Sequence, residues 1–215
     1  MNTDQNEIYY KKEKTLRAAW MISLLGPFVT TYAFLVSQSA TIFADLLRRT
    51  TELLSLFFSW FIFKKVNKTS ITKPIYYSDK LENLSGLFIS IVMFFSFGLI
   101  IVNTINEFAD PKEVGWILPG LVIALFGVII NGYFWKRHRS LAKEESTPIL
   151  EAQWQLYRSK TVVDSSVVIT LVSSEIFTPY EWHLYIDPVG SIVVAIFVLA
   201  SAIKVFKETI TSLFF

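Results

Sequence analysis

The stretch SATIFADLLRRTTELLS, residues 39–55, places four charged side chains inside an otherwise hydrophobic run. The run from Thr41 to Phe63 is long enough to cross a bilayer, which takes about 20 helical residues. A charge at mid-bilayer costs roughly 2.5–3.5 kcal/mol on insertion scales. The four side chains must therefore face protein or water and have partners. Helical spacing offers two such pairs, Asp45 with Arg49 and Arg48 with Glu52.

A second charged pair lies far downstream, where Lys160 and Asp164 are also four residues apart. Because buried charges need counter-charges, we expect this pair to meet the 39–55 cluster inside the membrane. Two interpretations of the combined cluster stay open. It is either part of an ion or proton pathway, or a set of salt bridges whose role is to hold the helices together. Arg49 can also snorkel to the interface, which would remove it from the set.

The composition is that of an integral membrane protein. The chain of 215 residues is 53% hydrophobic and has 19 Phe, 6 Trp and 9 Tyr, whereas soluble domains are about 45–50% apolar with glycine counted. A net charge of +2 argues against nucleic acid as a partner. With no cysteine and only His138 and His183, thiolate and imidazole-rich metal sites are excluded. We expect both histidines on the surface outside the spans, no cofactor and no enzymatic activity.

Six hydrophobic segments predict an all-α membrane protein, a bundle of six transmembrane helices. They cover residues 18–37, 40–63, 84–106, 114–135, 157–178 and 186–206, with polar loops at 64–83 and 136–153. The remaining loops are short, which favours antiparallel neighbours. We expect an N-terminal tail over 1–17, a transmembrane domain over 18–208, and a C-terminal end over 209–215 without a cytoplasmic domain.

The lysines and arginines predict the orientation. They gather before the first segment, in the loops at 64–83 and 136–153, and after the last segment, whereas the three alternate loops carry only Lys112. Because positive residues are retained in the cytoplasm, both termini are expected to be cytoplasmic. Aromatic residues near the segment ends fit an interfacial belt: Trp116, Trp135, Tyr180, Trp182 and Tyr185.

Small residues and one dipeptide predict local packing. Asp187-Pro188 is interpreted as a helix start, with the Asp as a cap and the Pro in the first turn. The small residues expected at close helix contacts are Gly86, Ser90, Gly120, Ala124, Gly127, Gly190, Ala195 and Ala200.

Several motifs, taken in order, resemble those of one family. The first runs through Ser39, Ile42, Asp45, Arg48, Glu52 and Ser55; YYSDKLE retains Lys80 and Glu82; STPILEA begins at Ser146; and DPVGS begins at Asp187. The chain thereby resembles the transmembrane domain of the cation diffusion facilitator family, whose members export zinc, manganese, iron and related divalent ions. The family's second helix reads approximately S-x-A-[apolar]-[apolar]-x-D-x-x-H-x-x-x-D-x-x-S. The resemblance extends from about residue 17 to the end.

The family's ligand positions carry different residues here. The resemblance places the bound ion between a His or Asp with an Asp four residues later on helix two, and the same pair on helix five. Arg48 and Glu52 occupy the first pair. For helix five, an ungapped count from Pro148 gives Leu156 and Lys160, and a one-turn shift gives Lys160 and Asp164. We prefer the shift because it sets opposite charges against Arg48 and Glu52.

These substitutions change what the site could bind. Arginine has no lone pair for a metal and lysine coordinates only when deprotonated. If a cation binds, Glu52 and Asp164 are its ligands, with Asp45 at most a third, and such oxygen ligands suit a hard ion better than zinc. We expect Arg48 and Lys160 to replace the bound cation electrostatically.

The resemblance implies a membrane cation transporter, working as a cation/proton antiporter with an altered charged site. Its pathway residues are Asp45, Arg48, Glu52, Lys160 and Asp164. The alternative is a transport-inactive relative that serves as an assembly or regulatory subunit, and a third reading is transport of an anionic or zwitterionic solute held by Arg48. The resemblance also implies a homodimer. The other expected partners are the lipid bilayer and a small inorganic cation, which the resemblance implies to be divalent. The expected location is a bacterial plasma membrane, which the chain crosses several times.

Overall fold

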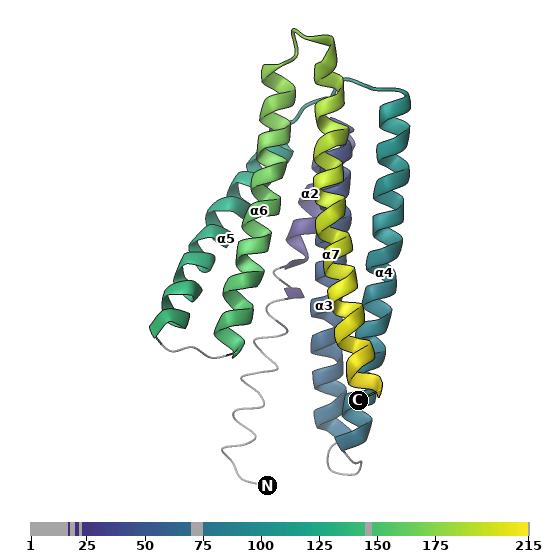
Figure 1. The fold of residues 1–215 in the computed structure, drawn as a ribbon, viewed down its shortest axis with the longest axis vertical. Helices are drawn as coiled ribbons and strands as arrows, with labels where there is room; N and C mark the ends of the chain where they lie inside the picture. The colour runs from purple at the N-terminus through teal and green to yellow at the C-terminus, as the bar shows by residue number, and fades with distance from the viewer. Residues whose placement is uncertain (1–16, 18–19, 22, 70–74, 145–147, 215) are drawn as a thin grey trace. The chain divides into compact units, whose positions relative to one another are not determined.

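In the part of the chain that it describes, the computed structural model consists of helices joined by short non-helical segments (Figure 1). It describes residues 17, 20, 21, 23–69, 75–144 and 148–214, of which 59, 63, 65–69, 75–83, 141, 142, 144, 148–153 and 212–214 are described in backbone only. Six α-helices and one 3-10 helix follow one another: α2 (Leu25–Ser37), α3 (Ala40–Thr69), α4 (Ile75–Ala109), α5 (Leu118–Glu144), α6 (Pro148–Ile176), η1 (Glu181–Tyr185) and α7 (Ile186–Phe214). The all-α prediction is confirmed.

Four helices extend beyond the predicted hydrophobic segments at the ends that carry the basic residues. Helix α3 continues to Thr69 and α5 to Glu144, while α4 begins at Ile75 and α6 at Pro148. The loops predicted at 64–83 and 136–153 are therefore largely helical, and that prediction is wrong. The physical reason is that hydropathy marks where lipid contact ends, whereas a helix continues through good helix formers such as Lys, Glu, Leu and Ala. The motif residues Lys80, Glu82 and those at 146–152 lie outside the described side chains.

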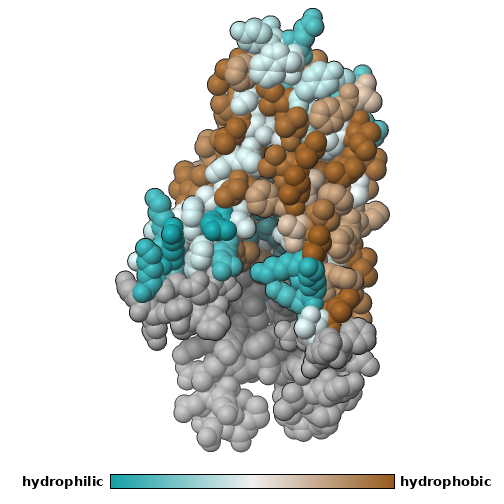
Figure 2. Space-filling model, in the orientation of Figure 1, coloured by the Kyte–Doolittle hydropathy of each residue, from teal (hydrophilic) through white to brown (hydrophobic). Residues whose placement is uncertain are grey.

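Among the residues that the structure describes, three helices are long and apolar enough to cross a membrane. They cover Leu84–Ala109 in α4, Leu118–Ser140 in α5 and Glu181–Thr211 in η1 and α7, and α2 is a shorter apolar helix. Helices α3 and α6 have 30 and 29 residues but carry the two charged clusters. Large hydrophobic side chains such as Phe95 and Phe126 are more than half exposed, 67% and 60% respectively. Figure 2 shows hydrophobic side chains covering much of the surface, as lipid contact requires.

The chain divides into two compact units, which are described separately. Unit 1 comprises the described parts of 1–28, 47–99 and 198–215, and unit 2 comprises 29–46 and 100–197. In unit 1, Ile89, Met93 and Ala202 form a buried cluster. Phe58, Phe94 and Val205 pack against that cluster.

The turn between α2 and α3 is closed by backbone hydrogen bonds. Gln38 adopts a left-handed conformation with φ 54°, and its N–H donates to Phe34 O at 2.8 Å. A residue in this conformation directly after a helix returns the chain and satisfies a terminal carbonyl. The predicted turn at 37–39 is confirmed by the helix bounds.

Helix α3 begins on a polar site shared with α7. Ser39 Oγ accepts the N–H of Ile42 at 3.1 Å and donates to Asp187 Oδ1 at 2.7 Å. The Asp187 carboxylate also accepts the N–H groups of Ala40, at 2.5 Å, and Thr41, at 3.3 Å. The first three N–H groups of α3, which have no partner within the helix, are thus all satisfied. Asp187 is a cap as predicted, but chiefly of α3 rather than of its own helix.

Small residues let the helices of each unit approach closely. In unit 2 a Cβ on Gly190 would lie 2.6 Å from Thr41 Oγ1 and would also meet the side chain of Thr170, and one on Gly120 would meet Ile42. In unit 1 a Cβ on Gly86 would meet Thr209. Of the other small residues expected at contacts, Ser90, Ala124 and Ala195 are buried. Ala200 is exposed in unit 1, so that part of the prediction is wrong.

We expect Asp187→Ala to lower the unfolding free energy by about 2–3 kcal/mol, because Ser39 and the first N–H groups of α3 would lose a buried acceptor. Asp187→Asn keeps one carbonyl acceptor and should lose less. The measurement is the thermal midpoint of the detergent-purified protein. Asp110→Ala is the matched control, because that carboxylate is 80% exposed. Equal midpoints for the Asp187→Ala and Asp110→Ala variants would contradict the capping role.

Candidate functional site

The charged stretch of α3 contains a short, mostly buried ion pair. Arg48 Nη1 lies 2.7 Å from Glu52 Oε1, and the two side chains are 8% and 31% exposed. The pairing across one helical turn is the one that the spacing predicts, and it is confirmed. Asp45 is 3% exposed on the same helix. Its predicted pairing with Arg49 stays a prediction.

Asp164 on α6 is completely buried against α5. Its carboxylate accepts a hydrogen bond from Asn131 Nδ2 at 2.8 Å. A Cβ on Gly127 would lie 2.7 Å from Asp164 Cγ and would also meet Oδ2, so the glycine leaves room for the carboxylate beside the α5 backbone. Sequence reasoning flagged Gly127 only as a small contact residue and missed Asn131. The available signal was that these two residues are four apart on α5 and therefore share a face.

Lys160 lies one turn before Asp164 on α6 and is half-buried. Next to it, an aromatic stack joins α6 to α5. Tyr157 stacks on Phe134, with ring centroids 5.1 Å apart, and on His138, at 5.2 Å. The packing of α5 against α6 therefore determines the position of Lys160 along the helix pair.

The predicted site residues fall in both units. Arg48 and Glu52 belong to unit 1, and Asp45, Lys160 and Asp164 belong to unit 2. The predicted meeting of the two clusters stays a prediction. Among the described residues, no group of three or more His, Asp or Glu side chains is arranged to hold a metal ion. The assignment of Glu52 and Asp164 as cation ligands likewise stays a prediction.

The expectation of two plain surface histidines is wrong. His183 is only 9% exposed, and its Nδ1 lies 2.6 Å from Tyr180 O in η1. His138 is half-buried, and its Nδ1 lies 2.8 Å from Phe134 O. Both lie within the membrane-length helices, because α5 continues beyond its hydrophobic segment and η1 precedes α7 without a break.

Unit 2 also contains a polar cavity that sequence reasoning missed. Its volume is about 430 Å³, and it is lined by Phe34, Gln38, Asn103, Asn106, Glu107, Ala109, Asp110 and Lys112. These residues come from the end of α2 and from the end of α4 and the loop after it, so no local motif announces the cavity. Amide and carboxylate oxygens gather at this end, where Lys112 lies 3.5 Å from Asp110.

Membrane-length helices, exposed apolar side chains and buried charges define a multi-pass integral membrane protein. Residues 16–214 match the family model of the cation efflux transmembrane domain, and the chain belongs to this family. The family consists of transporters rather than enzymes, and its transmembrane domain is a six-helix bundle, in agreement with the six α-helices of the described residues. A comparison with curated proteins found no match to this chain.

We expect Gly127→Ala to destabilise the protein by about 1–3 kcal/mol, because the added methyl group would displace the Asp164 carboxylate or separate the helices. The matched control is Gly98→Ala on α4, where a Cβ would meet nothing within 4 Å. That change should be neutral or stabilising by up to about 1 kcal/mol, since alanine favours the helix. Thermal unfolding in detergent measures both, and a Gly127→Ala variant as stable as the Gly98→Ala variant would refute the tight contact.

Proposed function

We propose that the protein exchanges a cation for protons across a membrane by alternating access, through a charged site altered from that of its family. Membership of the cation efflux family supports cation transport. The proposed pathway residues are Asp45, Arg48 and Glu52 on α3 and Lys160 and Asp164 on α6. Glu52 and Asp164 bind the cation or the proton, and Asp45 lies on the access path.

The observation that carries the proposal is the Arg48–Glu52 ion pair. These residues stand where the family resemblance places two cation ligands, and the guanidinium lies 2.7 Å from the carboxylate that would otherwise face the ion. A permanent positive charge held there neutralises the carboxylate as a bound cation would. We therefore infer that Arg48 replaces one ionic charge of the transported substrate. The engagement of Arg48 by Glu52 also disfavours a site for anionic solutes.

The burial of the acidic residues supports the same proposal. Asp164 is 0% exposed and Asp45 is 3% exposed, and both lie within helices of a membrane protein. Ionisable residues in such positions are expensive and are commonly found on ion or proton pathways. Asn131 donates a hydrogen bond to the Asp164 carboxylate at 2.8 Å, which fixes the position of this acidic group between α5 and α6.

A second candidate function is a transport-inactive subunit for assembly or regulation. Its support is that the Arg48–Glu52 pair neutralises itself within one turn of α3. In that case the charges act as a structural staple and carry no substrate.

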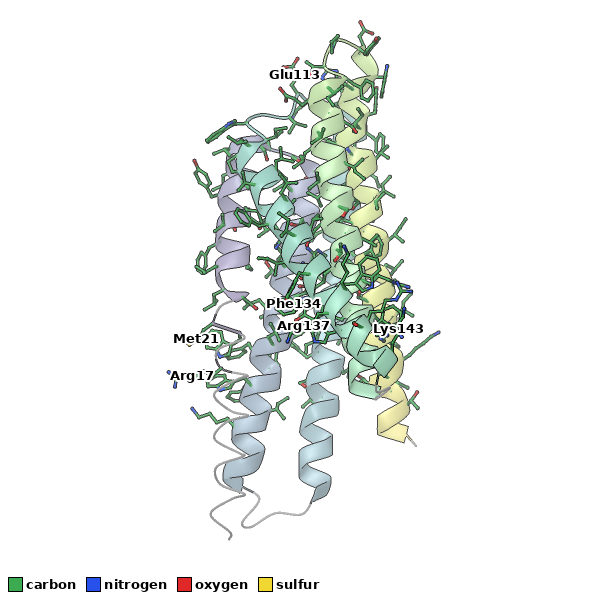
Figure 3. All side chains as sticks on the ribbon, turned by 90° about the vertical axis from the view of Figure 1, so that its left-hand side faces the viewer. Arg17, Met21, Glu113, Phe134, Arg137 and Lys143 are labelled. Carbon is green, nitrogen blue, oxygen red and sulfur yellow. The ribbon has the colours of Figure 1, made fainter. Side chains whose placement is uncertain are left out.

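We further propose a homodimer in a bacterial plasma membrane, with both termini cytoplasmic. The basic residues at one end of the helices support this orientation. In Figure 3, Arg137 and Lys143 lie at one end of α5 and Glu113 lies beyond the other end.

If Arg48 stands in for a cation, Arg48→Gln should create a site for one. The variant should lose about 1–3 kcal/mol of stability, because the half-buried Glu52 carboxylate loses its partner. Millimolar Mn²⁺ should then raise its thermal midpoint by mass action, and raise that of the wild type much less. Arg49→Gln removes the same charge from the neighbouring position and serves as the control. If Mn²⁺ raised the thermal midpoints of the Arg48→Gln and Arg49→Gln variants equally, the inference that Arg48 takes the place of a bound cation would be contradicted.

Flux through liposomes separates transport from the structural alternative. We expect protein in liposomes to move at least one of Zn²⁺, Mn²⁺, Fe²⁺, Co²⁺, Na⁺ and K⁺ against a proton gradient. Asp164→Asn should abolish this flux with the fold intact, because an amide carries neither the charge nor the proton. Glu113→Gln alters an exposed carboxylate and should leave the flux unchanged. If no ion moves and Glu52→Gln changes only stability, the inactive-subunit function is favoured instead.

A further inference from the structure

The basic end of α5 and α6 carries positive charge that no described carboxylate neutralises. Five exposed basic side chains lie there, and among the side chains that the structure describes none is ion-paired: Lys136, Arg137, Arg139 and Lys143 on α5 and Arg158 on α6. Over residues 133–160 the sequence has six basic residues, these five and Lys160, against Glu144, Glu145 and Glu151. This end of unit 2 is therefore positive and suited to an anionic partner.

Two of these arginines share one aromatic ring. Arg139 Cζ lies 6.0 Å and Arg158 Cζ 5.4 Å from the centroid of the Trp154 ring. A guanidinium within about 6 Å of an indole is attracted by the ring. Both guanidinium groups therefore lie within about 6 Å of the same ring. We call Arg139, Trp154 and Arg158 the basic clamp.

The base of the clamp is held in place by the packing of α5 against α6. Phe134, His138 and Tyr157 form the aromatic stack described above, which joins the two helices directly beside Arg139 and Arg158. Arg137 is positioned as well, since its Nη1 lies 3.0 Å from the hydroxyl of Tyr133. The anion-binding groups are therefore largely organised before any ligand arrives, which reduces the entropy lost on binding.

We propose that the basic clamp binds the phosphodiester headgroup of an anionic phospholipid. Two guanidinium forks match phosphate oxygens in geometry and charge. Arg139 lies one helical turn after the hydrophobic segment that ends at residue 135, so we expect the clamp at the level where headgroups begin. Tyr133 on the preceding turn is 57% exposed, as expected of an aromatic residue at the lipid interface. An exposed ring there favours a lipid over a soluble phosphate ester.

Binding of phosphatidylglycerol to the full-length protein in detergent tests the proposal, with native mass spectrometry as the readout. One basic residue near an anionic headgroup is worth about fivefold in affinity. The Arg139→Gln, Arg158→Gln double variant should therefore bind phosphatidylglycerol at least about tenfold more weakly. Zwitterionic phosphatidylcholine should bind wild type and variant alike. Lys204→Gln with Lys207→Gln removes two exposed charges from α7 outside the clamp and should weaken binding clearly less than the double arginine variant does.

Each other outcome overturns the proposal. If both double variants lost the same affinity for phosphatidylglycerol, the lipid would respond only to the net charge of the protein. If neither variant lost affinity, the clamp would not be the lipid-binding site. Competition by soluble glycerol phosphate as strong as that by the lipid would assign the clamp to a phosphate ester instead. Circular dichroism confirms that each variant is folded. If the glutamine pair does not fold, Arg139→Lys with Arg158→Lys retains the charge but loses the fork, and an unchanged affinity there would equally overturn the role of the guanidinium groups.

Discussion

The buried carboxylate of Asp187 is the constraint on which the rest of unit 2 depends. It is 1% exposed, and an ionised carboxylate without water must find hydrogen-bond donors. The donors are Ser39 Oγ and two N–H groups at the start of α3, which themselves lack partners within the helix. The carboxylate thus gains the donors that it needs, and the N–H groups gain an acceptor. The start of α3 is thereby tied to the start of α7, and the charged stretch of α3 begins at a defined height.

This contact also explains why two motifs of the sequence occur together. Ser39 opens the motif of the second predicted segment and Asp187 opens that of the sixth, and in the structure they form one hydrogen-bonded site. Gly190, one turn further along α7, lets the two helices approach closely enough for Thr41 Oγ1 to donate to Asp187 O at 2.7 Å. Sequence analysis identified Asp187 as a cap but assigned it to the wrong helix, because a capping partner 148 residues away leaves no local pattern.

Interactions within one helix were predictable, and interactions between helices were not. The Arg48–Glu52 pair follows from a spacing of four residues, and the number and order of the helices follow from the hydrophobic segments. The hydrogen bond from Asn131 to Asp164 joins residues 33 apart, and the cavity near Glu107 is built from two separate elements. The helix ends were missed most widely at the basic side, because backbone hydrogen bonds continue where lipid contact stops; at the other side α5 begins at Leu118 rather than at residue 114. The register of the α6 charges was likewise left open, since one alignment puts Leu156 and Lys160 at the ligand positions and another puts Lys160 and Asp164 there.

The helices continue beyond the hydrophobic segments at their basic ends, and this affects how the protein fits bilayers of different thickness. Helix α3 has 30 residues and is about 45 Å long, against a hydrocarbon layer of about 30 Å. At the start of α3 the turn at Gln38 is closed by a backbone hydrogen bond, so no further helix is present there to meet a thicker bilayer. At the other end, a thicker or thinner bilayer meets more or less of a helix that is already formed, and lysine and arginine stems adjust their reach. We therefore expect a change in bilayer thickness to be accommodated mainly at the basic end of α3.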